Sequence, residues 1–143
     1  MWPFGKKKHN RETPEKRALA VLSKYVNRLL DDYSDELDQS EDKRLAFFAF
    51  LFGSVSALAM REGLKPPQAH AVALALFNKG FGLSPEESTS FAQFGIDATG
   101  RDSPWAPAAH AGMEEFLAWK ADPSGFTPTR LRGVLDKAPP HPD

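Results

Sequence analysis

Residues 45–60 form the most apolar stretch of the chain, LAFFAFLFGSVSALAM, which contains no charged residue. A helix that is apolar on every side must be enclosed by other helices or by lipid. This stretch is shorter than the roughly 20 residues that cross a bilayer core. It also contains Gly53 and two serines, and charges lie at both of its ends. The pattern therefore predicts a buried central helix over about residues 41–62, capped by Ser40 and ended by Gly63.

Small residues recur along one side of this predicted helix at spacings of three and four, namely Ala46, Ala49, Gly53 and Ala57. A face without bulky side chains lets the backbone of a neighbouring helix come close. We expect that neighbour to belong to the same chain. The alternative is that the face pairs with a second copy and forms a homodimer.

The first helix is predicted from about Pro14 to Asp32, with Thr13 as its N-cap. Apolar residues recur there at intervals of three and four, as in an amphipathic helix packed on a core: Leu19, Leu22, Val26, Leu29 and Tyr33. The acidic residues 31–42 are expected to form a solvated connector to the central helix.

Caps and breaks predict the remaining helices. One covers about Pro67–Lys79, the next runs from a capping box at Ser84 and Glu87 to about Ile96, another carries Met113, Phe116 and Trp119, and a short one starts at Thr127–Pro128. No alternating pattern is long enough for a strand. We therefore predict an all-α fold, a compact bundle of five to six helices around residues 41–62. One domain at 13–137 lies between a flexible basic arm at 1–12 and a disordered tail at 138–143.

Charge is distributed unevenly, although the chain of 143 residues has a net charge of -1. Residues 1–17 carry six basic and two acidic side chains, whereas residues 31–42 carry seven acidic and no basic ones. Two solvated segments explain this pattern. The alternative is that the basic arm pairs with the acidic segment, in the same chain or in a second copy.

The sequence lacks the motifs that several classes of function require. There is no Cys, no Gly-x-Ser-x-Gly elbow and no Gly-rich phosphate loop. Residues 31–42 have the length of a calcium loop but Tyr33 and Glu36 at its third and sixth positions. A helix-turn-helix starting at Ser84 fails because Gly100, Pro104 and Pro107 interrupt the segment where the recognition helix would lie. We expect a protein that is not an enzyme, takes no cofactor and binds no nucleic acid.

Three side chains offer an alternative based on a metal ion. His110 and Glu114 are four residues apart on one helical face, and His70 lies on another predicted helix. If His70 faced the pair, two imidazoles and one carboxylate could hold a metal. A metal-dependent enzyme or metal-binding protein is the function that this arrangement would support.

The N-terminal residues offer a third alternative, a peripheral membrane protein. Trp2 and Phe4 precede Lys6, Lys7 and Lys8, a set that gives weak attachment to an anionic membrane surface. We favour a flexible leader, or docking of the two rings on the domain itself, because a short arm alone lacks the second signal that stable anchoring needs. No apolar segment of a secretory signal follows the basic residues, and we expect a cytoplasmic location.

A small helical protein without a catalytic set is expected to act by binding another protein, as an adaptor, an inhibitor or an immunity-like partner. Trp105, between two prolines, either anchors such an interface or closes the core under a loop. The other interaction candidates are Phe81 in the Gly80–Leu83 turn, Asp35, Glu36 and Asp38 in the acidic segment, and Trp2, Lys6, Lys7 and Lys8 in the arm.

Overall fold

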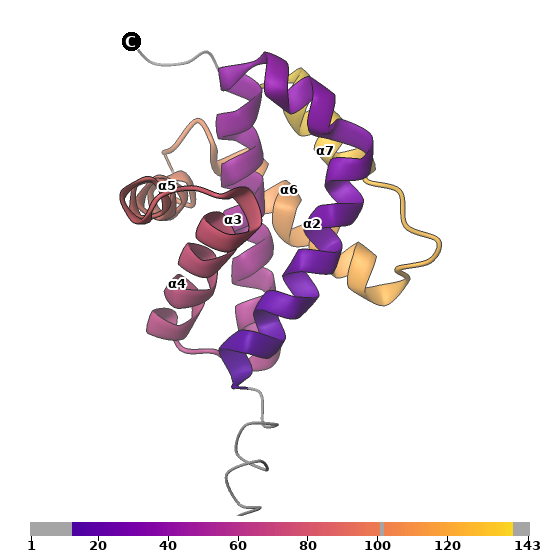
Figure 1. Ribbon diagram of the computed structural model, residues 1–143. Coiled ribbons are helices and arrows are strands. Elements are labelled where there is room, and N and C mark those ends of the chain that lie inside the picture. The colour runs from indigo at the N-terminus through magenta and orange to yellow at the C-terminus, as the bar shows by residue number, and fades with distance from the viewer. Residues whose placement is uncertain (1–12, 101, 139–143) are drawn as a thin grey trace, which may run out of the picture.

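A computed structural model of the chain describes residues 13–100 and 102–138 (Figure 1), and the regular elements in them are all helical. They are α2 (Pro14–Gln39), α3 (Glu41–Glu62), α4 (Pro66–Ala75), the single π-helical turn η1 (Leu76–Gly80), α5 (Pro85–Ala98), α6 (Ala106–Ala121) and α7 (Thr129–Asp136). The predicted all-α class is confirmed. The predicted basic arm at 1–12 and residues 139–143 of the predicted tail lie outside the described residues.

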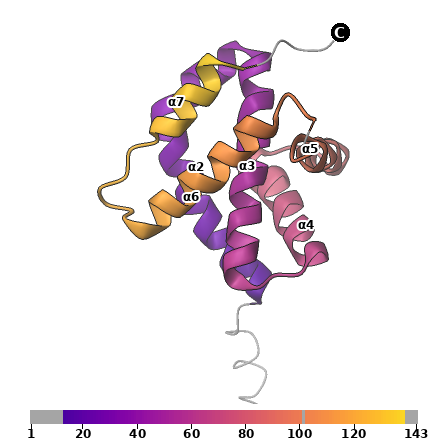
Figure 2. The same cartoon turned by 180° about the vertical axis from the view of Figure 1, so that it is seen from behind.

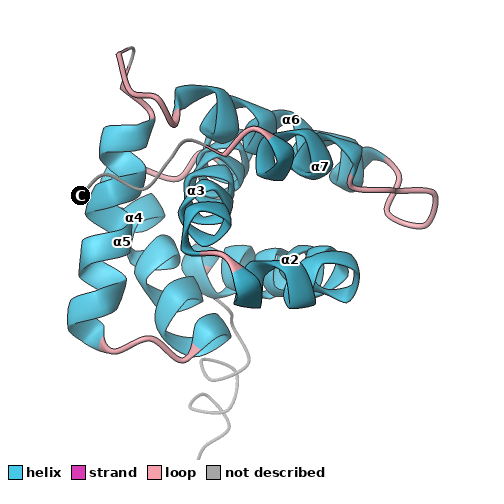
Figure 3. Cartoon of the chain, turned by 90° about the horizontal axis from the view of Figure 1, so that it is seen from above, coloured by secondary structure: helices cyan, strands magenta, loops and turns pink. Residues whose placement is uncertain are grey.

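The uncharged stretch is the centre of the fold. Helix α3 contacts each of the other α-helices. Seen from above, it lies between α4 and α5 on one side and α6 and α7 on the other, with α2 closing a third side (Figure 3). By length and composition α3 could cross a membrane, but 67% of its most apolar window is buried inside the protein. The burial agrees with its prediction as a core helix.

Helix α3 makes its closest contact with α6, which crosses it as seen from behind (Figure 2). A Cβ atom on Gly53 would lie 1.8 Å from the carbonyl oxygen of Ala109, and one on Gly112 would lie 1.8 Å from that of Phe50. Real Cβ atoms do not approach this closely, so only glycine fits at either position. The small-residue face of α3 is thus used within the chain, as expected.

The acidic segment is not a connector, which corrects the sequence prediction. Helix α2 continues through it to Gln39, and Ser40 then accepts a bond from the backbone N–H of Lys43 to cap α3. The helix continues because the segment has apolar residues to bury. Tyr33 and Leu37 extend the buried stripe of α2 by two more turns beyond Leu22, Val26 and Leu29. Burial of these two side chains outweighs the repulsion among the carboxylates on the solvent side.

The other boundaries differ from the predictions by a few residues. The predicted third helix is α4 followed by η1, where a wider turn carries the chain to Phe81. The capping box of α5 is present, because Ser84 accepts from the N–H of Glu87 and the Glu87 carboxylate accepts from the N–H of Ser84. Helix α7 begins at Thr129, just after the predicted start.

Candidate interaction surface

Trp105 belongs to the core. Only 7% of the residue is exposed, and its ring meets that of Phe94 edge-on at 5.4 Å between centroids. It packs in a small cluster with alanines of α3, α5 and α6. Of the two alternatives for Trp105, its burial agrees with closing the core under a loop and leaves little of the side chain for a partner to contact.

The three candidate metal ligands do not form a site. His110 Nε2 lies 3.8 Å from the Glu114 carboxylate, and both side chains are largely exposed on α6. His70 lines a different hollow, between α3, α4 and α5. Among residues 13–100 and 102–138, no three His, Asp or Glu side chains are grouped so that they could hold a metal. The alternative function built on these ligands loses its site.

Two other predicted candidates come together. Asp38 and Phe81 line the same hollow of about 220 Å³, which we call the α2–η1 pocket. Its lining comes from three parts of the chain: Leu30, Ser34, Leu37 and Asp38 on α2, Arg44, Phe47 and Phe48 on α3, and Phe81 after η1. The candidates Trp2, Lys6, Lys7 and Lys8 lie outside the described residues.

Aromatic rings give the pocket a firm apolar wall. Phe81 meets Phe48 edge-on at 5.4 Å and Phe47 at 6.1 Å between centroids. Phe48 in turn packs on the rings of Phe77 and Phe91 behind it. Edge-to-face and offset arrangements of this kind are the favourable ones for aromatic pairs. The turn after η1 therefore places the Phe81 ring against the aromatic side chains of α3.

Carboxylates line the solvent side of α2 beside the pocket. Asp31, Asp35 and Asp38 are exposed, and their spacing of four and three residues places them along one face. We call these three residues the acidic ridge. On the same helix, Asp32 forms an ion pair with Arg28, and Glu36 forms ion pairs with Lys43 and Arg132. The ridge therefore presents negative charge to solvent.

Arg44 lines the pocket and donates its hydrogen bonds to the backbone at the end of α2. Its guanidinium donates hydrogen bonds to the carbonyl oxygens of Leu37, at 2.9 Å, and Asp38, at 3.2 Å. These carbonyls belong to the last turn of α2, where the helix dipole favours a cation. Arg44 thus satisfies two carbonyl oxygens at the C-terminal end of α2.

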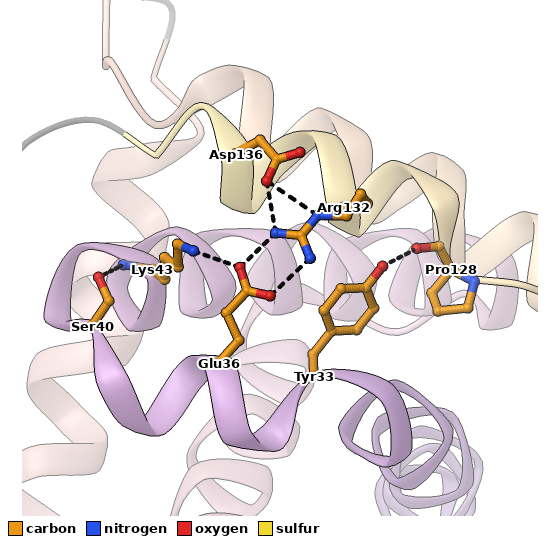
Figure 4. A network of polar contacts seen from close by, with 7 residues as sticks. All are labelled: Tyr33, Glu36, Ser40, Lys43, Pro128, Arg132 and Asp136. Carbon is orange, nitrogen blue, oxygen red and sulfur yellow. Dashed lines mark hydrogen bonds and ion pairs between the residues drawn. The ribbon is translucent and has the colours of Figure 1, made fainter.

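Glu36 has a structural task, in contrast to its predicted place in an interaction surface. Figure 4 shows its carboxylate between Arg132 of α7 and Lys43 of α3, with 2.7 Å between Arg132 Nη1 and Glu36 Oε1. Hydrogen bonds from these two cations lower the pKa of Glu36 to about 2. The carboxylate therefore stays ionised at neutral pH and ties α7 to α2 and α3.

Two further contacts hold α7, and the sequence analysis missed both. Tyr33 donates from its hydroxyl to the carbonyl oxygen of Pro128 at 2.9 Å. Glu115, fully buried, accepts from the N–H of Leu131 at 2.9 Å and from Arg130 at 3.2 Å. Burial raises the pKa of Glu115, while these bonds lower it. The signal for Glu115 in the sequence was its position next to Phe116 and four residues before Trp119, which places it on the apolar face of the helix.

Comparison with known proteins gives one match. The family model described as Immunity protein 48 (Imm48) covers residues 15–127. The matched range contains every residue that lines the α2–η1 pocket and ends before α7 begins. Searches of curated proteins and of solved structures gave no significant match.

Proposed function

The chain belongs to the immunity protein 48 family, and we propose that it neutralises a toxin protein by binding to it. The family match carries this proposal, because it extends over α2 to α6 and not over a short motif. A protein-binding role fits a chain whose candidate metal ligands are not assembled. The sequence suggested an adaptor, an inhibitor or an immunity-like partner, and the family match favours the immunity-like partner.

We place the toxin-binding surface at the α2–η1 pocket and the acidic ridge. The pocket offers an apolar wall, and the ridge offers exposed negative charge on the helix that lines it. Binding energy at protein interfaces concentrates where an apolar anchor fills such a pocket and polar groups surround it. This combination is the support for choosing this face.

Affinity capture from the native host tests the function. Tagged protein is used as bait, the captured proteins are identified by mass spectrometry, and each is expressed with and without this chain in a sensitive host. We expect one captured protein to arrest growth when expressed alone and to be harmless in the presence of this chain. Growth arrest that this chain does not relieve, for every captured protein, would contradict the proposal.

A pair of serine substitutions tests the surface. Ser34 is exposed at the pocket rim, so Ser34→Phe fills the pocket without disturbing the core. Ser90→Phe is the matched control, at an exposed position of α5 outside the pocket lining. We expect Ser34→Phe to lose protection of the host and Ser90→Phe to retain it. Equal protection by both variants would place toxin binding elsewhere on the molecule.

The expected cytoplasmic location remains part of the proposal. Cell fractionation with an antibody to the protein would test it directly, and recovery in the membrane pellet would favour the peripheral membrane alternative.

A further inference from the structure

The shape and charge of this surface also define the partner, and this inference rests on the proposed function. We propose that the toxin inserts one uncharged apolar side chain into the α2–η1 pocket and pairs Lys or Arg side chains beside it with Asp31, Asp35 and Asp38. The partner surface is therefore basic around an apolar anchor.

The pocket selects an uncharged occupant. Its walls are the side chains of Leu30, Leu37 and three phenylalanines, and its volume of about 220 Å³ suits one large apolar side chain. The two charges in its lining are of opposite sign, Arg44 and Asp38, so an ion of either sign inside the pocket would be attracted by one and repelled by the other. A charge buried without a partner loses its hydration and destabilises the complex, whereas an apolar side chain gains from burial.

The ridge selects the surroundings of that side chain. Because Glu36 is paired with Arg132 and Lys43, the exposed carboxylates that α2 offers to a partner here are those of the ridge, of which Asp38 also lines the pocket. Exposed charges of one sign attract a partner of opposite sign over about 8–10 Å at physiological ionic strength. They speed association more than they strengthen the final complex.

The basic arm of the same chain is a poor alternative occupant. Lys6 lies eight residues before Pro14, so its backbone reaches at most ~29 Å from the start of α2. Asp35 lies 21 residues along α2, or ~32 Å from the same point, near the far end of the helix. The arm would have to be fully stretched, at a large cost in conformational entropy. The ridge therefore calls for a second molecule.

A titration with two small probes tests the pocket without the toxin. Leucinamide carries a positive charge beside a leucine side chain, and N-acetyl-leucine carries the same side chain beside a negative charge. In ¹⁵N-correlated NMR spectra we expect leucinamide to shift the amide signals of Leu37 and Phe81 at millimolar concentration, with at least threefold higher affinity than N-acetyl-leucine. Shifts confined to other regions, or equal affinity of the two probes, would overturn the proposal.

Matched charge variants sharpen this titration. Asp31→Asn/Asp35→Asn/Asp38→Asn should abolish the preference for leucinamide. Glu62→Gln/Asp97→Asn/Glu114→Gln changes the net charge equally at exposed positions of α3, α5 and α6, and should retain it. Loss of the preference in both triple variants would mean that net charge, and not the ridge, discriminates between the probes.

The toxin identified by capture provides the second test. We expect the ridge variant to bind it at least tenfold more slowly in 50 mM salt and to lose most of this difference in 300 mM salt, while Ser34→Phe raises the dissociation rate. If both variants bind the toxin like the unmodified chain, this inference fails and the proposed function stands. If no captured protein is neutralised, the proposed function fails and the probe titration still decides the chemistry of the pocket.

Sedimentation equilibrium addresses the remaining occupant, a second copy of the chain that supplies its arm. A monomer supports the proposal. A dimer that dissociates when residues 1–12 are removed would show that the arm of a second copy fills the surface, and would overturn it.

Discussion

Gly53 and Gly112 set the distance between the two most closely packed helices of the molecule. Each glycine lies against a backbone carbonyl of the opposite helix, so that α3 and α6 meet without an intervening side chain. The crossing also holds a buried polar contact, in which Ser54 donates to the carbonyl oxygen of Gly112 at 2.8 Å and pairs with the hydroxyl of Tyr25 at 2.9 Å. Close approach and hydrogen bonding therefore depend on the same few residues.

Substitution of Gly112 tests this crossing. Gly112→Ala places a methyl group against the carbonyl of Phe50, so α3 and α6 must separate. Overpacking of this kind costs about 1–3 kcal/mol or more. We expect a fall of at least that size in the free energy of unfolding, measured with urea.

Gly133→Ala is the matched control, because it lies in α7 with open space around its Cβ position and without a positive φ angle. It should be neutral or stabilise the protein by up to about 1 kcal/mol. Equal destabilisation by both substitutions would contradict the close approach of α3 and α6.

Glu36 gives the protein a defined response to acid. Its pKa is about 2 in the folded protein against 4.5 ordinarily, so its contribution to stability is complete above pH 4.5 and is lost as the pH falls toward 2. We expect Glu36→Gln to lower the free energy of unfolding by about 1 kcal/mol at pH 7, as for a partly exposed bidentate pair. Urea unfolding of both proteins between pH 7 and 2 checks this, and the difference should vanish near pH 2.

The pKa of Glu115 is shifted in the opposite direction from that of Glu36, so its effect on stability has the opposite dependence on pH. Burial raises the pKa of Glu115, so the folded protein holds this proton more tightly than the unfolded chain does. The contribution of Glu115 to the free energy of unfolding therefore falls as the pH rises above 4.5. This contribution is common to the unmodified chain and Glu36→Gln, and it cancels in their difference. A difference that stayed constant down to pH 2 would mean that Glu36 acts by packing and not by charge.

At the scale of the helices, periodicity was a better guide than charge. The apolar stripe of α2 includes Tyr33, which was recognised, and one further turn brings in Leu37. Seven acidic residues in residues 31–42 nevertheless favoured a connector, because local charge repulsion is visible in the sequence and distant partners are not. Arg132, which neutralises Glu36, lies 96 residues away. Caps were predicted correctly at Ser40, Gly63 and Ser84, where the necessary contacts are local.

A proline in this part of α2 distinguishes helix from connector. Asp35→Pro removes a helical N–H and places the ring against the preceding turn, which costs about 3 kcal/mol inside a helix and little in a connector. We expect the larger cost, measured as a lower melting temperature and a loss of helical circular dichroism. Asp35→Ala removes the same carboxylate but favours a helix, and it should leave both quantities nearly unchanged.

The candidate surface was predictable in some of its residues, but the way in which they come together was not. Asp38 and Phe81 were both candidates, yet nothing in the sequence indicates that they share a pocket, since α3 and the turn after η1 must fold against α2 first. Trp105 illustrates the reverse. A tryptophan between prolines is expected to be exposed until the alanines of α3, α5 and α6 are seen to enclose it. Residue type indicates what a side chain can do, and packing decides whether a partner can reach it.

At the scale of the whole molecule, two apolar clusters share one central helix. The larger contains Trp119 with α2, α3, η1 and α7, and the smaller contains Trp105 with the alanines around it. Phe94 packs against both clusters, and α3 supplies residues to each. Disrupting either cluster would expose the part of α3 that belongs to it and would weaken the other cluster. We therefore expect residues 13–137 to unfold as a single unit.

Tryptophan fluorescence tests this cooperativity cluster by cluster. In a background with Trp2→Phe, the variant Trp105→Phe leaves Trp119 as the reporter of the larger cluster, and Trp119→Phe leaves Trp105 as the reporter of the smaller one. Each variant is destabilised by its own substitution, so its fluorescence curve in urea is compared with its own far-ultraviolet circular dichroism curve. We expect the two curves to coincide within each variant, because exposing either cluster uncovers α3 and removes the support of the other. A Trp105 signal that changed well before the helical signal would show that α5 and the start of α6 unfold separately, and would divide the domain.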